Sequence, residues 1–177
     1  MNWAVVNRRI VILGIAAALA GCSGQVPAPI ASAPVGLATD AEGLIALQNG
    51  LRVDFGRTQS STIASATKLM GAAPDQVVTN SDCGAGPLDI ATWNNRLTLL
   101  FQDGNFRGWV ANSRKIAAAN GLHPGMTRQQ ITDSGLTLRT TTLGSEFDAG
   151  GVFGLIENDG PRAKVTTMWA GTTCFFR

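Results

Sequence analysis

Few side chains in this chain could carry out covalent or acid–base chemistry: 177 residues include three cysteines and one histidine. A serine or cysteine nucleophile needs an imidazole or a comparable base beside it, and a zinc site needs several cysteine or histidine ligands. His123 directly precedes Pro124, which is typical of a turn. We therefore expect His123 to be exposed or locally hydrogen-bonded, and we predict no enzyme activity, cofactor or metal site from these residues.

Cys22 differs from the other cysteines in what precedes it. Arg8 and Arg9 are followed by an apolar segment, residues 10–20, which is too short for a bilayer that needs about 20 apolar residues. The sequence Leu19-Ala20-Gly21-Cys22 resembles the lipobox of bacterial lipoprotein signal peptides. The resemblance implies cleavage before Cys22 and attachment of fatty acyl chains, such as palmitate, to this residue. An uncleaved anchor or an ordinary secretory peptide is the alternative.

Residues 22–39 follow the predicted signal peptide (1–21) and are rich in proline, alanine and serine. This composition predicts a flexible tether that links a lipid anchor in the membrane to a folded part beginning near Asp40. The expected location is the cell envelope, facing the periplasm or another extracytoplasmic space. Ser23 is compatible with transport onward to an outer membrane, which is slightly favoured where the cell has one.

Cys83 and Cys174 remain once Cys22 is acylated, and two cysteines in an oxidising compartment most simply form a disulfide. Such a bridge could restrict the unfolded chain by about 4 kcal/mol. A redox-active or metal-binding pair is the alternative, although no Cys-x-x-Cys sequence accompanies it.

The charge balance argues against nucleic acid as a partner. Removing residues 1–21 removes Arg8 and Arg9 but no acid, so twelve of the 14 basic residues remain beside 12 acidic ones. No excess of positive charge is left to neutralise phosphates.

Acidic side chains are the remaining candidates for chemistry. Asp54, Asp89, Asp103 and Asp148 lie near predicted strand ends or turns, where solvated carboxylates are common. Two acidic turns, 146–148 and 157–159, lack the spacing of a known calcium loop. Paired carboxylates can hydrolyse glycosidic bonds. A cell-wall hydrolase is therefore an alternative function, which two carboxylates facing each other across a cleft would favour.

Three tryptophans, Trp93, Trp109 and Trp169, each end a predicted strand. They could line one sheet edge and form an aromatic contact surface for a protein or a ligand. Packing in a small core is the favoured interpretation, because tryptophans at strand ends often seal such cores. An apolar concavity lined by Trp93 and Trp109 would instead favour a ligand-binding or inhibitor module.

Local patterns predict an α+β chain. Asn49-Gly50 predicts a hairpin between residues 44–48 and 51–55, with a short helix capped by Thr39 and Glu42 as the alternative. Apolar spacing predicts helices over residues 59–70 and from Thr127 to Gly135. Further strands are expected at 90–93, 97–101, 106–110, 138–143, 152–157, 165–169 and 172–176, with Asp103-Gly104 and residues 158–160 as turns.

The two halves of the chain resemble each other. Residues 97–104 align with 152–160, and residues 55–58 and 124–127 occupy like positions before the two helices. This predicts one compact unit of two tandem helix-plus-antiparallel-sheet repeats, 40–120 and 121–177. The alternative is that any two hairpins with an Asp-Gly turn look alike.

One motif also resembles a known family. Gly125-Met126-Thr127, followed by Gln130 and Ile131, resembles the Gly-Met-Thr entry of small outer-membrane lipoproteins of the SmpA/OmlA (BamE) type. The tandem arrangement is similar to the β-lactamase-inhibitor-like fold. The first half has Phe55-Gly56-Arg57-Thr58 at the corresponding place, and no partner-binding residue carries over by position.

The sequence therefore predicts a lipid-anchored envelope protein that acts by protein–protein binding, as an accessory or scaffold in envelope assembly. It would contact its partner through the exposed face of its sheet. The alternatives are the cell-wall hydrolase and the ligand-binding or inhibitor module.

Overall fold

Short stretches of alternating apolar and polar residues, separated by glycine-containing turns, form strands over most of the folded part. The structure is a computed structural model, and it describes residues 36–174. The predicted signal peptide, most of the predicted tether and Cys22 lie outside the described residues. The described residues all belong to one compact unit, which spans Ser32–Arg177.

Twelve strands and two helices occur within residues 36–174. The first seven strands and the first helix are β1 (Leu37–Asp40), β2 (Gly43–Ala46), β3 (Arg52–Asp54), α1 (Gln59–Met70), β4 (Gln76–Asn80), β5 (Leu88–Trp93), β6 (Leu97–Gln102) and β7 (Asn105–Ala111). The remaining elements are β8 (Ala117–Ala118), α2 (Arg128–Asp133), β9 (Arg139–Thr141), β10 (Gly144–Asp148), β11 (Phe153–Ile156) and β12 (Val165–Gly171).

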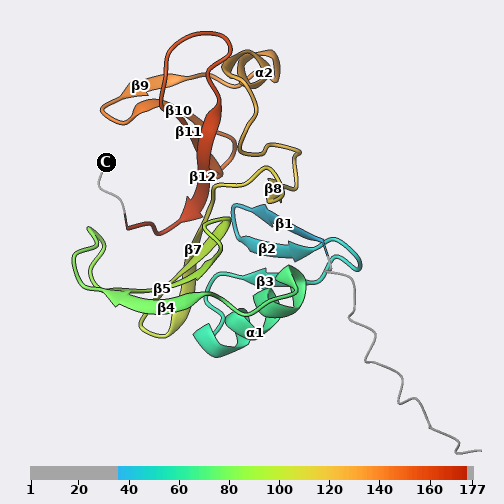
Figure 1. Cartoon of the computed structure of the whole chain (residues 1–177), viewed down its shortest axis with the longest axis vertical. Coiled ribbons are helices and arrows are strands. Elements are labelled where there is room, and N and C mark those ends of the chain that lie inside the picture. Colours follow the sequence, from blue (N-terminus) through green and yellow to red (C-terminus); the bar gives the residue numbers. More distant parts are fainter. Residues whose placement is uncertain (1–35, 175–177) are drawn as a thin grey trace, which may run out of the picture. The chain divides into compact units, whose positions relative to one another are not determined.

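The strands form two sheets (Figure 1). The larger sheet has the order β4-β5-β6-β7-β12-β11-β10-β9, and all its neighbouring strands are antiparallel. The smaller sheet has the order β3-β2-β1-β8, in which β1 and β8 are parallel. The chain is therefore mixed but mostly β.

The main core lies between one face of the large sheet and the elements that cover it. Leu44 of β2, Ala66 of α1 and Ile131 of α2 are buried in the same cluster as Trp109 of β7. We call this face of the large sheet the inner face and the opposite one the outer face. Because side chains alternate along a strand, the register places a second set on the outer face: Ile90, Thr98, Val110, Phe153, Leu155, Thr167 and Trp169.

The predicted helix over residues 59–70 is confirmed at both ends. Thr62, Ala66 and Leu69 lie on its buried side, at the three- and four-residue spacing of an amphipathic helix. Gly71 ends α1 in the left-handed conformation, with φ 73°. The N-cap residue of α1 is Thr58, whose side chain makes no capping hydrogen bond.

The second helix is confirmed from Thr127 onward. The Thr127 hydroxyl accepts a hydrogen bond from the Gln130 backbone N–H, and the Gln130 side chain accepts one from the Thr127 backbone N–H at 2.8 Å. This reciprocal capping box satisfies two N–H groups that a helix start leaves unpaired. Gly135 follows with φ 84°, as the sequence predicted.

Both predicted hairpins form, with different loops. Asp103 and Gly104, both with positive φ, make a two-residue turn between β6 and β7. β2 and β3 pair as predicted for Asn49-Gly50, so the helix alternative is wrong, but their connection runs from Leu47 to Leu51.

The folded part begins earlier than predicted. β1 begins at Leu37, and Leu37, Ala38 and Thr39 are buried against the core. Residues 37–39 therefore belong to the folded part rather than to the tether.

Several predictions of strands were incomplete. β1, β4, β8 and β10 were missed, and residues 138–143 contain β9 and a turn rather than one strand. Residues 172–174 are not in a strand, because Gly171, with φ 71°, ends β12 and turns the chain. The loop from Ile156 to Val165 is longer than the predicted turn at residues 158–160.

The description of the fold as two helix-plus-sheet repeats needs correction. The small sheet lies outside such a plan, and the boundary predicted at residues 120 and 121 falls in the loop between β8 and α2. Strands from both sides of that boundary form one continuous sheet, because β7 pairs with β12. Each helix is nevertheless followed by four strands that pair in sequence order.

The chain enters both helices by the same hydrogen bonds. Before α1, the Gly56 N–H donates to the Phe106 carbonyl at 2.7 Å, and the Phe106 N–H donates to the Arg57 carbonyl at 2.7 Å. Before α2, the corresponding pair joins Val165 to Gly125 and Met126, at 2.8 Å for each bond. Residues 55–58 and 124–127 therefore occupy like places, as the sequence indicated.

The two helix starts differ in one respect that can be measured. Replacing Thr127→Ala removes the capping hydroxyl of α2 and should lower the free energy of unfolding by about 1 kcal/mol. Thr58→Ala is the matched control, because Thr58 occupies the same position before α1 but makes no side-chain cap hydrogen bond; its effect should be smaller. Urea unfolding of both variants checks this, and equal losses would contradict it.

Candidate functional site

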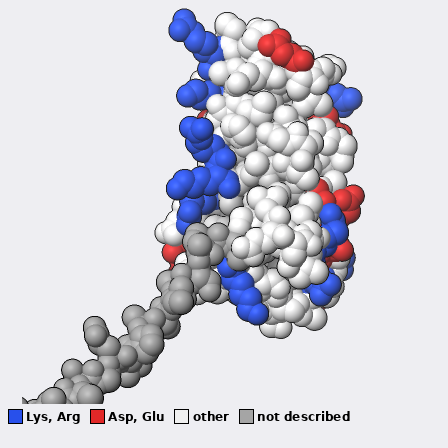
Figure 2. Space-filling model, turned by 90° about the vertical axis from the view of Figure 1, so that its right-hand side faces the viewer, with Lys and Arg blue, Asp and Glu red and all other residues white. Residues whose placement is uncertain are grey.

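Charged side chains are unevenly distributed on one face of the molecule (Figure 2). Lys and Arg side chains gather along the left edge of this view, whereas the right edge carries both acidic and basic side chains. A broad area between them is uncharged. This face therefore offers a binding partner an uncharged surface with a basic margin.

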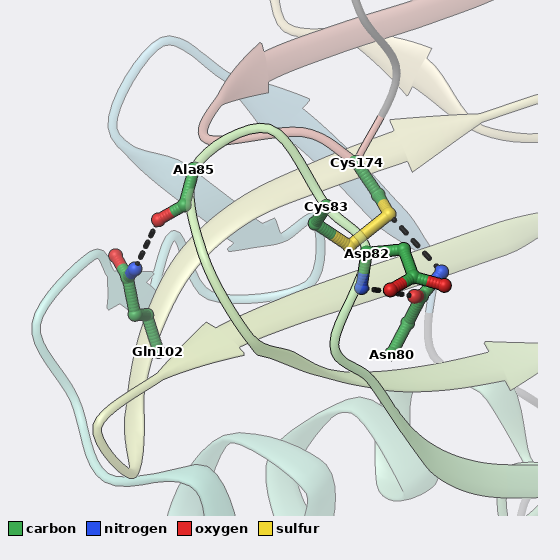
Figure 3. Close-up of a disulfide and its surroundings, with 6 residues drawn as sticks. All are labelled: Asn80, Asp82, Cys83, Ala85, Gln102 and Cys174. Atoms are coloured by element: carbon green, nitrogen blue, oxygen red, sulfur yellow. Dashed lines mark hydrogen bonds between the residues drawn. A yellow bond between two sulfur atoms is a disulfide. The ribbon is translucent and has the colours of Figure 1, made fainter.

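The predicted disulfide between Cys83 and Cys174 is confirmed, with an S–S distance of 2.00 Å (Figure 3). It joins the loop between β4 and β5 to the segment after β12. The two cysteines pack against Leu88 and Leu100 on the outer face, beside Val110. The Asn80 side-chain amide lies 3.3 Å from the Cys174 sulfur, and the Asn80 Oδ1 accepts a hydrogen bond from the Asp82 N–H at 2.9 Å.

The segment that carries Cys174 lies directly on the backbone of β7. The Thr172 N–H donates to the Arg107 carbonyl at 2.9 Å. A Cβ atom on Gly108 would lie 2.0 Å from the Thr172 carbonyl oxygen, so no side chain fits there. The disulfide and this close contact together cover the outer face over β6 and β7.

The three tryptophans are buried, so the favoured core interpretation holds and the exposed aromatic surface does not form. Trp93 and Trp109 lie on the inner face in the main core, with exposed fractions of 1% and 0%. Their indole N–H groups donate to the carbonyl oxygens of Ala72 and Asp40 at 2.8 Å. An apolar concavity lined by Trp93 and Trp109 is therefore also excluded, because both rings fill the core.

Trp169 belongs to a different environment. It lies on the outer face, where it pairs across the strands with Val110 and Phe153. The Phe153 ring stacks on the indole ring with a centroid distance of 5.9 Å and an interplanar angle of 18°. Trp169 is itself buried, with an exposed fraction of 1%.

Two cavities adjoin this aromatic pair on the outer face. An apolar hollow of about 220 Å³ is lined by Leu143, Leu155, Thr167 and Trp169. A polar cavity of about 600 Å³ lies against Phe153, and its polar side chains include Arg139, Thr141, Glu146 and Asp148. We call the two cavities and the Phe153–Trp169 pair the outer-face site.

The outer-face site could be foreseen only in part. Alternation along residues 165–169 places Thr167 and Trp169 on one face of the strand, a pattern that is visible in the sequence. Arg139, Leu143 and Leu155 line the site only because the strands that carry or flank them lie next to β12 or to one another in the sheet. No local pattern specifies that order.

The acidic residues are spread over the molecule. Glu146 and Asp148 line one cavity, but they share a strand and lie side by side rather than across a cleft. Glu146 accepts a hydrogen bond from the Thr141 hydroxyl at 3.2 Å, and Asp148 accepts one from the Gly151 N–H at 2.8 Å. Asp89 accepts a hydrogen bond from Thr79.

The other singled-out polar residues have local roles. Asp103 lies in the β6–β7 turn, and the acidic turn at 157–159 is held by hydrogen bonds from Thr166 and Arg128. His123 donates from Nδ1 to the Pro124 carbonyl at 2.9 Å, which confirms the expected local hydrogen bond. Among residues 36–174, no three His, Cys, Asp or Glu side chains are grouped so that they could hold a metal ion.

Asp54 belongs to a charge cluster at one end of the small sheet. The Arg52 guanidinium contacts Asp40 at 2.6 Å, Asp54 at 2.8 Å and Glu42 at 3.5 Å. Burial tends to raise the pKa of Asp40. Arg52 outweighs this effect through its hydrogen bond and its charge, together with hydrogen bonds from the backbone N–H groups of Glu42 and Gly43. The pKa of Asp40 therefore lies below its ordinary value of 3.8.

Comparisons with known proteins add no assignment. The chain matches no protein-family model, and no curated protein or solved structure matches it. Within the described part of the chain, neither helix has the length and apolar character needed to cross a membrane.

The lowered pKa of Asp40 predicts a pH dependence of stability. Since its carboxyl is more acidic in the folded state than in the unfolded state, it stabilises the fold above the unfolded pKa, and this contribution is lost as the pH falls through the folded pKa. Asp40→Asn keeps an oxygen for the Glu42 and Gly43 N–H groups but removes the charge. Urea unfolding between about pH 5 and pH 2 should show a smaller acid-induced loss in the variant. Parallel losses in both proteins would contradict the prediction.

Proposed function

We propose that the protein is a lipid-anchored component of the cell envelope that binds a protein partner through the outer-face site, as an accessory or scaffold in envelope assembly. Its mature form would begin at an acylated Cys22, and its folded part would face the extracytoplasmic space. The observation that carries the binding proposal is the apolar hollow lined by Leu143, Leu155, Thr167 and Trp169, on the face of the sheet opposite the helices.

The anchor proposal is supported by the residues around Cys22 and by the bridge between the other two cysteines. Disulfides such as Cys83–Cys174 persist in exported proteins and are rare in reducing compartments. Two or three acyl chains on one cysteine are enough for stable attachment, whereas a single chain gives marginal binding.

The binding proposal is supported by the variety of groups in the outer-face site. Leu143 and Leu155 offer apolar contact, whereas Arg139, Glu146 and Asp148 offer charge of both signs. Leu143 is one of the exposed large apolar residues of the described part of the chain, with an exposed fraction of 40%. An apolar centre with polar groups around it is the usual composition of a protein interface.

The similar halves of the large sheet support a further proposal, that they are tandem copies of one ancestral unit. The hydrogen bonds before the two helices equate Phe106 with Val165. At the same offset Trp109 corresponds to Met168, and the pair Trp109 with Ala170 corresponds to the observed pair Met168 with Ala111. Such a duplication is the arrangement that the β-lactamase-inhibitor-like resemblance implied.

Acylation can be measured directly. Cells that express the full chain and are fed an alkyne-tagged fatty acid should produce a labelled protein whose N-terminal peptide begins at modified Cys22. Cys22→Ala should abolish the label, because this thiol is the proposed attachment point. A bare Cys22 in the membrane-extracted protein, shown by mass spectrometry, would overturn the anchor proposal.

Partner binding can be tested by photo-crosslinking in cells. Leu155 replaced by p-benzoylphenylalanine should give a crosslinked species of defined mass, because Leu155 lines the apolar hollow. The matched control places the same amino acid at Lys68, an exposed position on α1. Introducing Phe153→Ala beside the label at Leu155 should remove most of the crosslinked species.

The fold of each labelled protein is checked by the Cys83–Cys174 bridge, which protects both thiols from alkylation. Equal crosslinking at Leu155 and Lys68, or crosslinking that is unaffected by Phe153→Ala, would exclude the outer-face site as the binding surface.

A further inference from the structure

Two exposed leucines mark the turn between β2 and β3. Leu47 and Leu51 have exposed fractions of 64% and 66%, the largest among the exposed large apolar residues of the described part of the chain. Between them lie Gln48, Asn49 and Gly50, which carry no charge. We call residues 47–51 the hairpin tip. It presents two apolar side chains to solvent without a charged residue among its five positions.

The folded part of the chain begins against this hairpin tip. The Leu47 N–H donates to the Gly36 carbonyl at 2.9 Å, and a Cβ atom on Gly36 would lie 3.0 Å from the Leu47 side chain. Leu37, the first residue of β1, pairs with Ala46 at the end of β2. In Figure 1 the turn after β2 lies at the same end of the small sheet as the start of β1.

The position of Gly36 constrains where an anchored protein can meet its membrane. Residues 23–35 separate the proposed acylation site from Gly36, a span of about 40 Å in a polyproline II conformation at about 3.1 Å per residue. Among the described residues, those around Gly36 are therefore the nearest to the proposed anchor along the chain. The hairpin tip is part of that region, since Leu47 contacts Gly36.

The charges of the small sheet are concentrated at its other end. Asp40, Glu42 and Asp54 gather around the Arg52 guanidinium at the turn between β1 and β2, opposite the hairpin tip along the strands. Charged groups are costly to bring into contact with acyl chains, whereas leucine side chains gain by leaving water. The small sheet thus has an apolar end beside the chain entry and a charged end away from it.

We propose that the hairpin tip inserts Leu47 and Leu51 into the surface of the bilayer that holds the acylated Cys22. The inference rests on the proposed lipid anchor and adds a second, protein-mediated contact with the same membrane. Two leucines alone would bind a bilayer weakly. A short tether raises their effective concentration at the surface, so that a weak contact is populated. The contact would fix which end of the small sheet faces the lipid.

The test uses the full acylated protein in phosphatidylcholine–phosphatidylglycerol vesicles. Leu51→Cys is labelled with bimane, while Cys83 and Cys174 are held in their disulfide and Cys22 is acylated. The matched control is Val78→Cys, an exposed apolar position on edge strand β4. We expect a blue shift for the label at position 51, strong quenching by brominated acyl chains and a severalfold drop in iodide quenching relative to position 78.

The outcomes separate this inference from the anchor proposal. An acylated protein in which positions 51 and 78 are quenched equally by iodide would overturn membrane insertion and leave the anchor intact. A label at position 51 that is shielded from both iodide and brominated chains would indicate a protein occupant, such as a second copy, and would also overturn it. A bare Cys22 would remove the anchor itself, and the inference with it.

A second variant tests the contribution of Leu47. Leu47→Ser in the labelled Leu51→Cys protein should restore much of the iodide quenching. Unchanged shielding would overturn the proposal.

Discussion

The pairing of β7 with β12 is the constraint on which the large sheet depends, because it joins strands far apart in the chain into one surface. Trp109 lies opposite Ala170, and Trp169 lies opposite Val110, so each indole ring has a smaller neighbour across the strands. The two rings lie on opposite faces, one in the main core and one beside Phe153. A large side chain also lies opposite a small residue between β10 and β11. A Cβ atom on Gly154 would lie 2.2 Å from the Phe147 ring.

Features that depend on neighbours in sequence could be predicted from the sequence. The apolar spacing of Ile63, Ala66 and Leu69, with Gly71 after them, specifies α1 by itself. Asp103-Gly104 specifies a turn because both residues tolerate positive φ. The pair of Cys83 and Cys174 could be predicted by elimination. The helix and turn patterns each involve only a few neighbouring residues. The disulfide follows because only two cysteines remain once Cys22 is set aside.

Features that depend on strand order could not be predicted in this way. β4 is an edge strand whose residues are mostly exposed, so it lacks the alternation that marks a half-buried strand. Residues 172–174, the described part of the strand predicted at 172–176, are not in a strand, because the bare backbone of Gly108 lets Thr172 cross β7 at close range. The outer-face site likewise combines side chains from β9 to β12, and its composition follows from the registers of those strands. Local alternation identifies the faces of a strand but not the strand beside it.

The bridge between Cys83 and Cys174 has a consequence for the way the molecule responds to proteolysis. The two residues are 91 positions apart, and the covalent loop they close contains α2 and every strand of the large sheet except β4. A protease that cuts the long exposed loop between β11 and β12 would break the backbone without dividing the protein. Both pieces would stay joined through sulfur, and β12 could keep its place between β7 and β11. Damage in this loop therefore need not release the C-terminal fragment.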